Sequence, residues 1–116
     1  MSPRVDDTLR RLALNDEHAI RSVVDPGPLS FATSRLDAKT YALARLAALV
    51  SLGAPTASCR WSAELAHEAG ATEDEIVGIL WAIGPVVGLA RIVAAAPALA
   101  LAIGYDVDAA FEEPRG

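Results

Sequence analysis

The sequence predicts an all-α domain whose helices pack into an oligomer, and three features support this. The composition is 53% hydrophobic but only 5% aromatic, and the abundant alanine and leucine favour packed helices over strands. No segment shows the alternation of apolar and polar residues that indicates a half-buried strand. Residues 76–103 are apolar apart from one charge, Arg91. The length of 116 residues fits one domain.

Residues 76–103 are interpreted as two or three core helices, buried on most faces. A membrane span needs about 20 mostly apolar residues. Gly84-Pro85 and Pro97 should break this stretch, and Arg91 would lie near mid-bilayer. A domain of this size has a limited interior, so helices that are apolar all round also suggest a subunit interface. Small residues such as Gly88 would let these helices pack closely, and we expect a homo-oligomer.

Charge and cysteine content exclude several classes of protein. A net charge of −5 argues against non-specific nucleic-acid binding and against a polybasic membrane anchor. We therefore expect no nucleic acid and no membrane among the partners. The single cysteine, Cys59, excludes an intramolecular disulfide. The first residues, MSPRVDDTLRR, lack the apolar core of a signal peptide, so a cytoplasmic protein is expected.

Residues 1–35 are predicted to form an N-terminal helical arm and a loop. Asp6 or Asp7 would cap a first helix over residues 8–14. Asn15-Asp16 should break this helix before a second apolar stripe begins. An Asp-Pro-Gly-Pro turn signal then opens a loop that is expected to continue to the end of the arm.

Residues 36–104 are predicted to form the helical core. Asp37 suits the N-cap of a helix that ends at Gly53. Thr56 or Ser58 could cap the next helix, which should stop at Gly70.

A capping box, with Thr72 at the N-cap and Glu75 three residues later, should start the apolar stretch. Residues 105–116 are predicted to form a C-terminal tail, with a turn and a short helix over residues 109–112.

Arg91 is the most informative single residue, because a charge in so apolar a stretch must find a partner. One interpretation is structural: an ion pair, with Asp37, Glu64 or Glu68 as the acid, or hydrogen bonds to the carbonyl groups at a helix end. The other is an anion-binding role in a cleft, since a guanidinium binds carboxylates bidentately.

Polar residues gather near the start of the helix that contains Cys59. Such a cysteine can have a lowered pKa, but nucleophilic chemistry also needs a base within reach. His67 follows Cys59 by eight residues, or about 12 Å along a helix, and cannot serve it within one chain. Glu64 and His67 have the spacing of half a di-metal site, but the required second copy is missing from the sequence. We therefore expect no metal.

Three segments together resemble the carboxymuconolactone decarboxylase and alkylhydroperoxidase D-like family. They are LDAKTYALARLAALVSLGA, a helix ending in EAGATEDEIVGIL, and GPVVGLAR. The resemblance covers about residues 36–101, and its most specific part is the GATEDEI turn with its spacing from LDAKT. It implies an alkylhydroperoxidase D-like helical domain that assembles through its helices into trimers or hexamers.

The family's peroxidase branch resembles this chain in the order of its helices and turns but not in its active-site residues. Those enzymes carry a Cys-x-x-Cys pair at the start of the helix before the GAT turn. A His follows the second Cys by four residues, and a Glu lies about three turns earlier. Counted back from Gly70, the cysteine positions hold Pro55 and Ser58, and the histidine position holds Ser62. The glutamate position falls near Ala42.

A one-residue gap would instead align Cys59 with the second cysteine, Thr56 with the first and Ala63 with the histidine. Neither register restores the motif, so the resemblance does not imply a Cys-x-x-Cys alkylhydroperoxidase. The decarboxylase branch does not need the cysteine pair, although its histidine is also replaced here, by Ser62.

Two classes of function remain open. One is a cofactor-free, lyase- or decarboxylase-like enzyme that acts on a small organic acid or related metabolite. The other is a non-catalytic oligomeric module that binds a small molecule or a partner. We expect no cofactor in either case. The candidate pocket residues are Ser58, Cys59, Trp61, Ser62 and Arg91.

Overall fold

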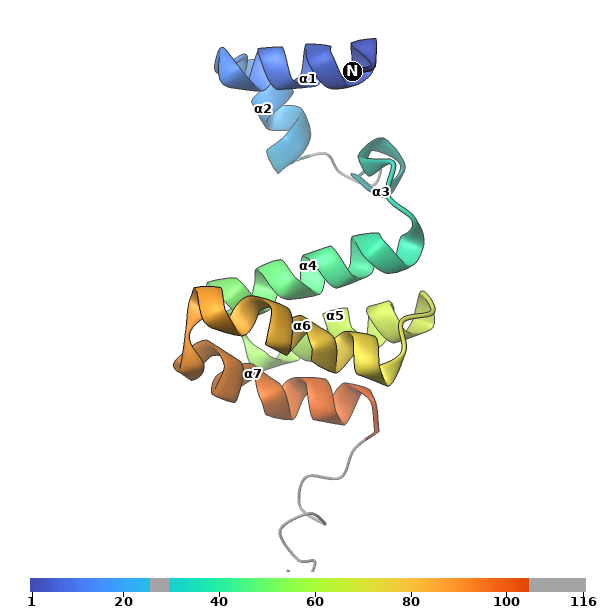
Figure 1. The fold of residues 1–116 in the computed structure, drawn as a ribbon, viewed down its shortest axis with the longest axis vertical. Helices are drawn as coiled ribbons and strands as arrows, with labels where there is room; N and C mark the ends of the chain where they lie inside the picture. Colours follow the sequence, from blue (N-terminus) through green and yellow to red (C-terminus); the bar gives the residue numbers. More distant parts are fainter. Residues whose placement is uncertain (26–29, 105–116) are drawn as a thin grey trace, which may run out of the picture. The chain divides into compact units, whose positions relative to one another are not determined.

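The computed structural model describes residues 1–25 and 30–104, and their regular structure is entirely helical (Figure 1). The prediction of an all-α fold is confirmed. The chain divides into two compact units, one of residues 1–35 and one that begins at Leu36. The predicted C-terminal turn and short helix lie outside the described residues.

The first unit contains α1 (Pro3–Ala13), α2 (Glu17–Val24) and α3 (Ser30–Ser34), none of which has a buried residue. The cap expected at Asp6 or Asp7 is wrong, because the Ser2 side chain accepts the N–H of Val5 and starts α1 earlier. Proline suits the first position of a helix, which explains the earlier start. The loop expected to run to residue 35 instead contains α3.

The break between the first two helices lies where the sequence places it. Asn15 has a φ of 56°, and Asp16 caps α2 by accepting the N–H of Ala19. Asparagine tolerates this left-handed conformation better than most residues, which explains why the helix stops there.

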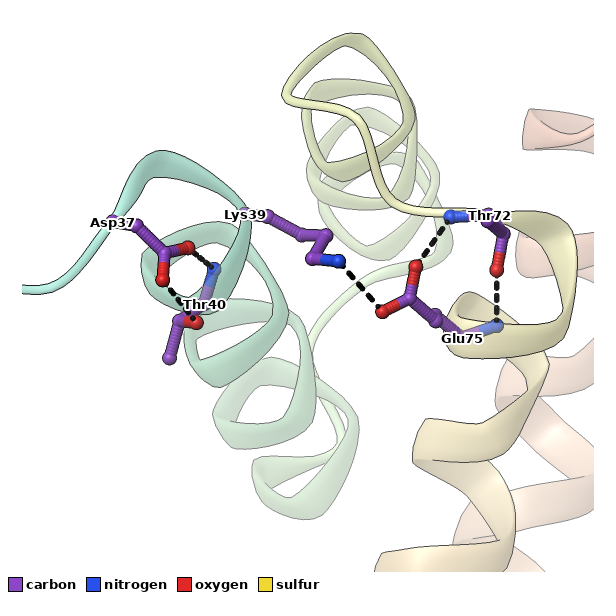
Figure 2. Close-up of polar contacts among 5 residues, drawn as sticks. All are labelled: Asp37, Lys39, Thr40, Thr72 and Glu75. Atoms are coloured by element: carbon purple, nitrogen blue, oxygen red, sulfur yellow. Dashed lines mark hydrogen bonds and ion pairs between the residues drawn. The ribbon is translucent and has the colours of Figure 1, made fainter.

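The second unit packs four helices around one core: α4 (Ala38–Leu52), α5 (Thr56–Glu68), α6 (Glu73–Val87) and α7 (Leu89–Ala102). The predicted caps at Asp37 and Thr72 are both present, and Figure 2 shows them. The buried hydrophobic residues are mainly small, which lets the helices approach closely. They are Leu46, Val50, Cys59, Ala63, Ala66, Ala71, Ile76, Ala95, Ala98 and Leu99.

The apolar stretch forms two helices, α6 and α7, but the break between them is not where we expected it. Pro85 and Pro97 both lie inside helices, and the chain turns at Gly88 instead. Gly88 has a φ of 88°, a conformation that only glycine adopts readily. Figure 1 shows α7 running back beside α6 after this turn.

Much of α6 and α7 is exposed in the single chain, contrary to the expectation of burial on most faces. The side chain of Trp81 is 82% exposed and that of Leu89 is 78% exposed. Both belong to a groove of about 520 Å³ on the surface of these two helices. Its lining is Val77, Leu80, Trp81, Gly84, Pro85, Leu89 and Ile92. None of the described helices has the length and hydropathy of a membrane span.

Candidate functional site

A cleft of about 470 Å³ lies where the end of α4 and the start of α5 meet the end of α6 and the start of α7. The walls are mostly small aliphatic side chains, and Arg91 is the only charged residue among them. The full lining is Val50, Gly53, Ala54, Thr56, Cys59, Val87, Ala90, Arg91, Ala94 and Ala95.

Arg91 lies in the first turn of α7, and its guanidinium group lies over the backbone of Gly53 at the end of α4. A Cβ atom added to Gly53 would lie 3.0 Å from Arg91 Cζ and would overlap Nη1. Glycine is favoured at this position by a φ of 69°, and any larger residue would also push the guanidinium group out of this place. The C-terminal end of α4 also favours a nearby cation, because the helix dipole is negative there.

The acids proposed as partners of Arg91 interact with other groups or lie unpaired. Asp37 accepts hydrogen bonds from the N–H and hydroxyl of Thr40, at 2.8 and 3.0 Å. Glu64 pairs with Arg60 at 3.0 Å. In residues 1–25 and 30–104, no carboxylate lies within ion-pair distance of Arg91. The ion-pair interpretation is therefore wrong for these residues, and the exposed guanidinium lies at the cleft beside the end of α4.

The two helices that begin at the cleft lack side-chain caps. Pro55 stands at the N-cap of α5 and Gly88 at the N-cap of α7, and neither helix has an acid in its first turn. The cap expected from Thr56 or Ser58 is wrong, because Pro55 takes that position. By contrast, α1, α2, α4 and α6 all have a side chain that accepts a first-turn N–H. The positive ends of the α5 and α7 dipoles are thus left open beside Arg91, which favours an anion.

Cys59 is the other titratable group in the cleft lining. Its side chain is 2% exposed, and Sγ donates a hydrogen bond to the carbonyl oxygen of Ala54 at 3.7 Å. Burial raises the pKa of the Cys59 thiol above its usual range. The thiol therefore stays protonated at neutral pH, where it can donate a proton but is a poor nucleophile. In the described part of the chain, no histidine or carboxylate lines the cleft to deprotonate it.

The structure brings together two of the five candidate site residues, Cys59 and Arg91. Ser62 lies on the same helix but is only 6% exposed and faces the core beside Ala63. Ser58 is half-buried, and Trp61 is 64% exposed; neither lines the cleft.

Gly53 and Thr56 are cleft residues that the sequence indicated only as helix-end signals. A Gly-x-Pro-Thr segment that links two core helices marks a helix junction, but its proximity to Arg91 depends on the tertiary packing. In the described part of the chain, no cluster of three or more His, Cys, Asp or Glu could hold a metal ion.

Comparison with protein-family models matches residues 29–101 to the carboxymuconolactone decarboxylase family. Comparisons with curated proteins and with solved structures found no match. The matched segment includes α4, α5, α6, all but the last residue of α7, and every residue of the cleft lining. It spans well over half of the chain, and the protein therefore belongs to the carboxymuconolactone decarboxylase family.

Proposed function

We propose that this protein binds a small organic acid in the Arg91 cleft and acts on it without a cofactor, in a lyase- or decarboxylase-like reaction. The observation that carries the proposal is the Arg91 guanidinium, which lines the cleft without a carboxylate partner in the described chain. A guanidinium binds a carboxylate through two parallel hydrogen bonds.

The surroundings of Arg91 support an anionic ligand in two further ways. The uncapped starts of α5 and α7 present the positive ends of two helix dipoles to the cleft. Among the described residues, none that lines the cleft is acidic, so none of them repels a carboxylate. The Thr56 hydroxyl, in the first turn of α5, adds a neutral hydrogen-bonding group to the same lining.

Cys59 supports the lyase-type reaction, because a decarboxylation leaves an electron pair on carbon that must be protonated. When the bond to the departing carboxylate breaks, CO₂ leaves and the carbon takes a proton. The protonated Cys59 thiol is the cleft group suited to supply it, and the thiolate would then recover a proton from water. In this scheme the substrate is a 3-oxo acid with one carboxylate. Arg91 binds the carboxylate and the neighbouring ketone oxygen, and it stays on that oxygen, which is an enolate oxygen once CO₂ has left.

A non-catalytic binding module is the second candidate, and one observation favours it. The cleft lining contains neither an imidazole nor a carboxylate, which are the usual general bases of enzymes. As a binding module, the protein would still bind the organic acid through Arg91 but would break no bond in it.

We also propose that the protein is a homo-oligomer, a trimer or hexamer, assembled through α6 and α7. The exposed apolar groove on these helices supports this proposal, because large apolar patches on small soluble domains commonly mark protein interfaces.

Acid binding by the wild type and by two arginine variants tests the proposal. Titration calorimetry with short carboxylic acids should show binding to the wild type. The affinity of Arg91→Met for these acids should be lower by about tenfold or more, because a charge-assisted hydrogen-bonded pair is removed. Arg45→Met is the matched control, since Arg45 is an exposed arginine that donates to the Tyr41 hydroxyl at 2.8 Å outside the cleft. Equal affinity in all three proteins, or no binding to any, would overturn the proposal.

Release of CO₂ from short 3-oxo acids, whose ketone oxygen can take up the electron pair as an enolate, separates the two candidates. Release that Cys59→Ala slows, with binding retained, supports the enzyme. Binding without any release supports the binding module.

A further inference from the structure

The described residues that line the Arg91 cleft include a single charged one, Arg91, and from this we infer which acids the cleft binds. We propose that the cleft prefers monocarboxylates with a small aliphatic body over dicarboxylates of the same length. The inference rests on the proposed function and narrows its substrate class.

Polar side chains are few among the described residues of the cleft. The Thr56 hydroxyl and Cys59 thiol come from the first turn of α5, and the Arg91 guanidinium from the first turn of α7. The remaining lining is aliphatic or glycine: Val50, Gly53, Ala54, Val87, Ala90, Ala94 and Ala95. The volume of about 470 Å³ is within the usual range for small-molecule sites, so the body of a short acid fits between these walls.

A second carboxylate on the ligand would have no partner in this lining. Once the first carboxylate occupies Arg91, no other cation remains among the cleft residues. The second group would either lose its water against valine and alanine side chains or pull the body of the ligand out into solvent. A terminal methyl group at the same position instead gains contact with the walls.

Pairs of acids that differ only at the far end test this directly. Hexanoate should bind the wild type about tenfold or more tightly than adipate, and pentanoate more tightly than glutarate. Burial of one methyl-sized group alone raises the affinity for hexanoate about fourfold. The unpaired carboxylate of adipate weakens its binding and so widens the difference. If neither acid of a pair binds, the proposed function fails as well. If the dicarboxylate binds equally or more tightly, only this inference is overturned.

A second cation in the aliphatic wall should reverse the preference. Ala94 is exposed, lines the cleft and lies one helical turn after Arg91 on the same face of α7. Ala94→Lys should therefore raise the affinity for adipate several-fold and leave that for hexanoate similar or weaker. Ala44→Lys, at an exposed alanine of α4 outside the lining, is the control and should change neither.

Ala90→Lys serves the same purpose if Ala94→Lys does not fold, because Ala90 is also exposed and lines the cleft. An unchanged ratio of adipate to hexanoate affinity in a folded cleft variant would contradict the inference.

Discussion

Lys39 Nζ lies 3.0 Å from Glu75 Oε2, and this ion pair joins the first turn of α4 to the first turn of α6 (Figure 2). The other carboxylate oxygen of Glu75 accepts the backbone N–H of Thr72 at 3.0 Å. One side chain thus completes the cap of α6 and fixes α6 against α4. Both side chains are partly exposed, so the pair acts more through orientation than through a large gain in stability.

Acid should destabilise the fold partly through Glu75. The hydrogen bond from the Thr72 backbone, followed by the one from Lys39, lowers the pKa of Glu75 below its ordinary value of 4.5. Because the folded state has the lower pKa, ionised Glu75 stabilises the fold above about pH 4.5, and this contribution is lost as the pH falls through the lowered pKa. Thermal melts across this range should show a smaller acid-induced loss for Glu75→Gln than for the wild type.

Glu68→Gln is the control for this experiment, because Glu68 is an exposed carboxylate near the end of α5. It should follow the wild-type pH profile. If Glu68→Gln reduced the acid-induced loss as much as Glu75→Gln, the effect would not come from the link between α4 and α6.

Gly53→Ala should weaken acid binding by moving Arg91. The added Cβ would overlap the guanidinium, so the Arg91 side chain has to leave its place over the end of α4. We expect a loss in carboxylate affinity of about tenfold, close to that of Arg91→Met. Gly70→Ala is the matched control, because Gly70 also has a positive φ, of 101°, but nothing lies within 4 Å of its added Cβ.

The control separates backbone strain from displacement of the arginine. Gly70→Ala should lower the melting temperature, because it places alanine at an unfavourable φ, but it should bind acids like the wild type. Wild-type affinity in Gly53→Ala would show that the observed position of Arg91 is not needed for binding.

Thiol-dependent peroxide turnover should be absent or trivial. Cys59 is the only cysteine of the chain, it is buried, and its pKa is raised by that burial. A peroxide-consumption assay with a dithiol reductant should give the same low rate for the wild type and Cys59→Ser. Robust turnover that Cys59→Ser abolishes would contradict this prediction.

Local signals explain why most helix ends could be predicted from the sequence. Asp37, Thr72 and Gly53 act within one turn of their own helix, so their chemistry is readable without tertiary structure. Pro85 and Pro97 misled the prediction because a proline removes a hydrogen bond without necessarily ending a helix. Gly88, which takes a φ of 88°, is the residue at which the chain turns.

The candidate site could be predicted less well, because it depends on contacts between helices distant in sequence. Arg91 stands out in the sequence as a charge within an apolar stretch and Cys59 as a cysteine near the start of a helix, and the two do share a cleft. The direction in which Ser62 points, into the core, follows from the angle at which α5 packs. The closeness of Gly53 to Arg91 has no local signature either.

Leu89→Lys should disrupt the proposed oligomer. Leu89 lines the apolar groove of α6 and α7 and is 78% exposed in the single chain, so a lysine there places a charge in the proposed interface without disturbing the core. Light scattering at micromolar concentration should give a trimer or hexamer for the wild type and a smaller species for Leu89→Lys.

Leu52→Lys is the matched control, because Leu52 is 75% exposed on α4 outside the groove, and it should keep the wild-type mass. A monomeric wild type would reject the oligomer itself. An oligomer of unchanged mass in Leu89→Lys would show that the chains associate through another surface.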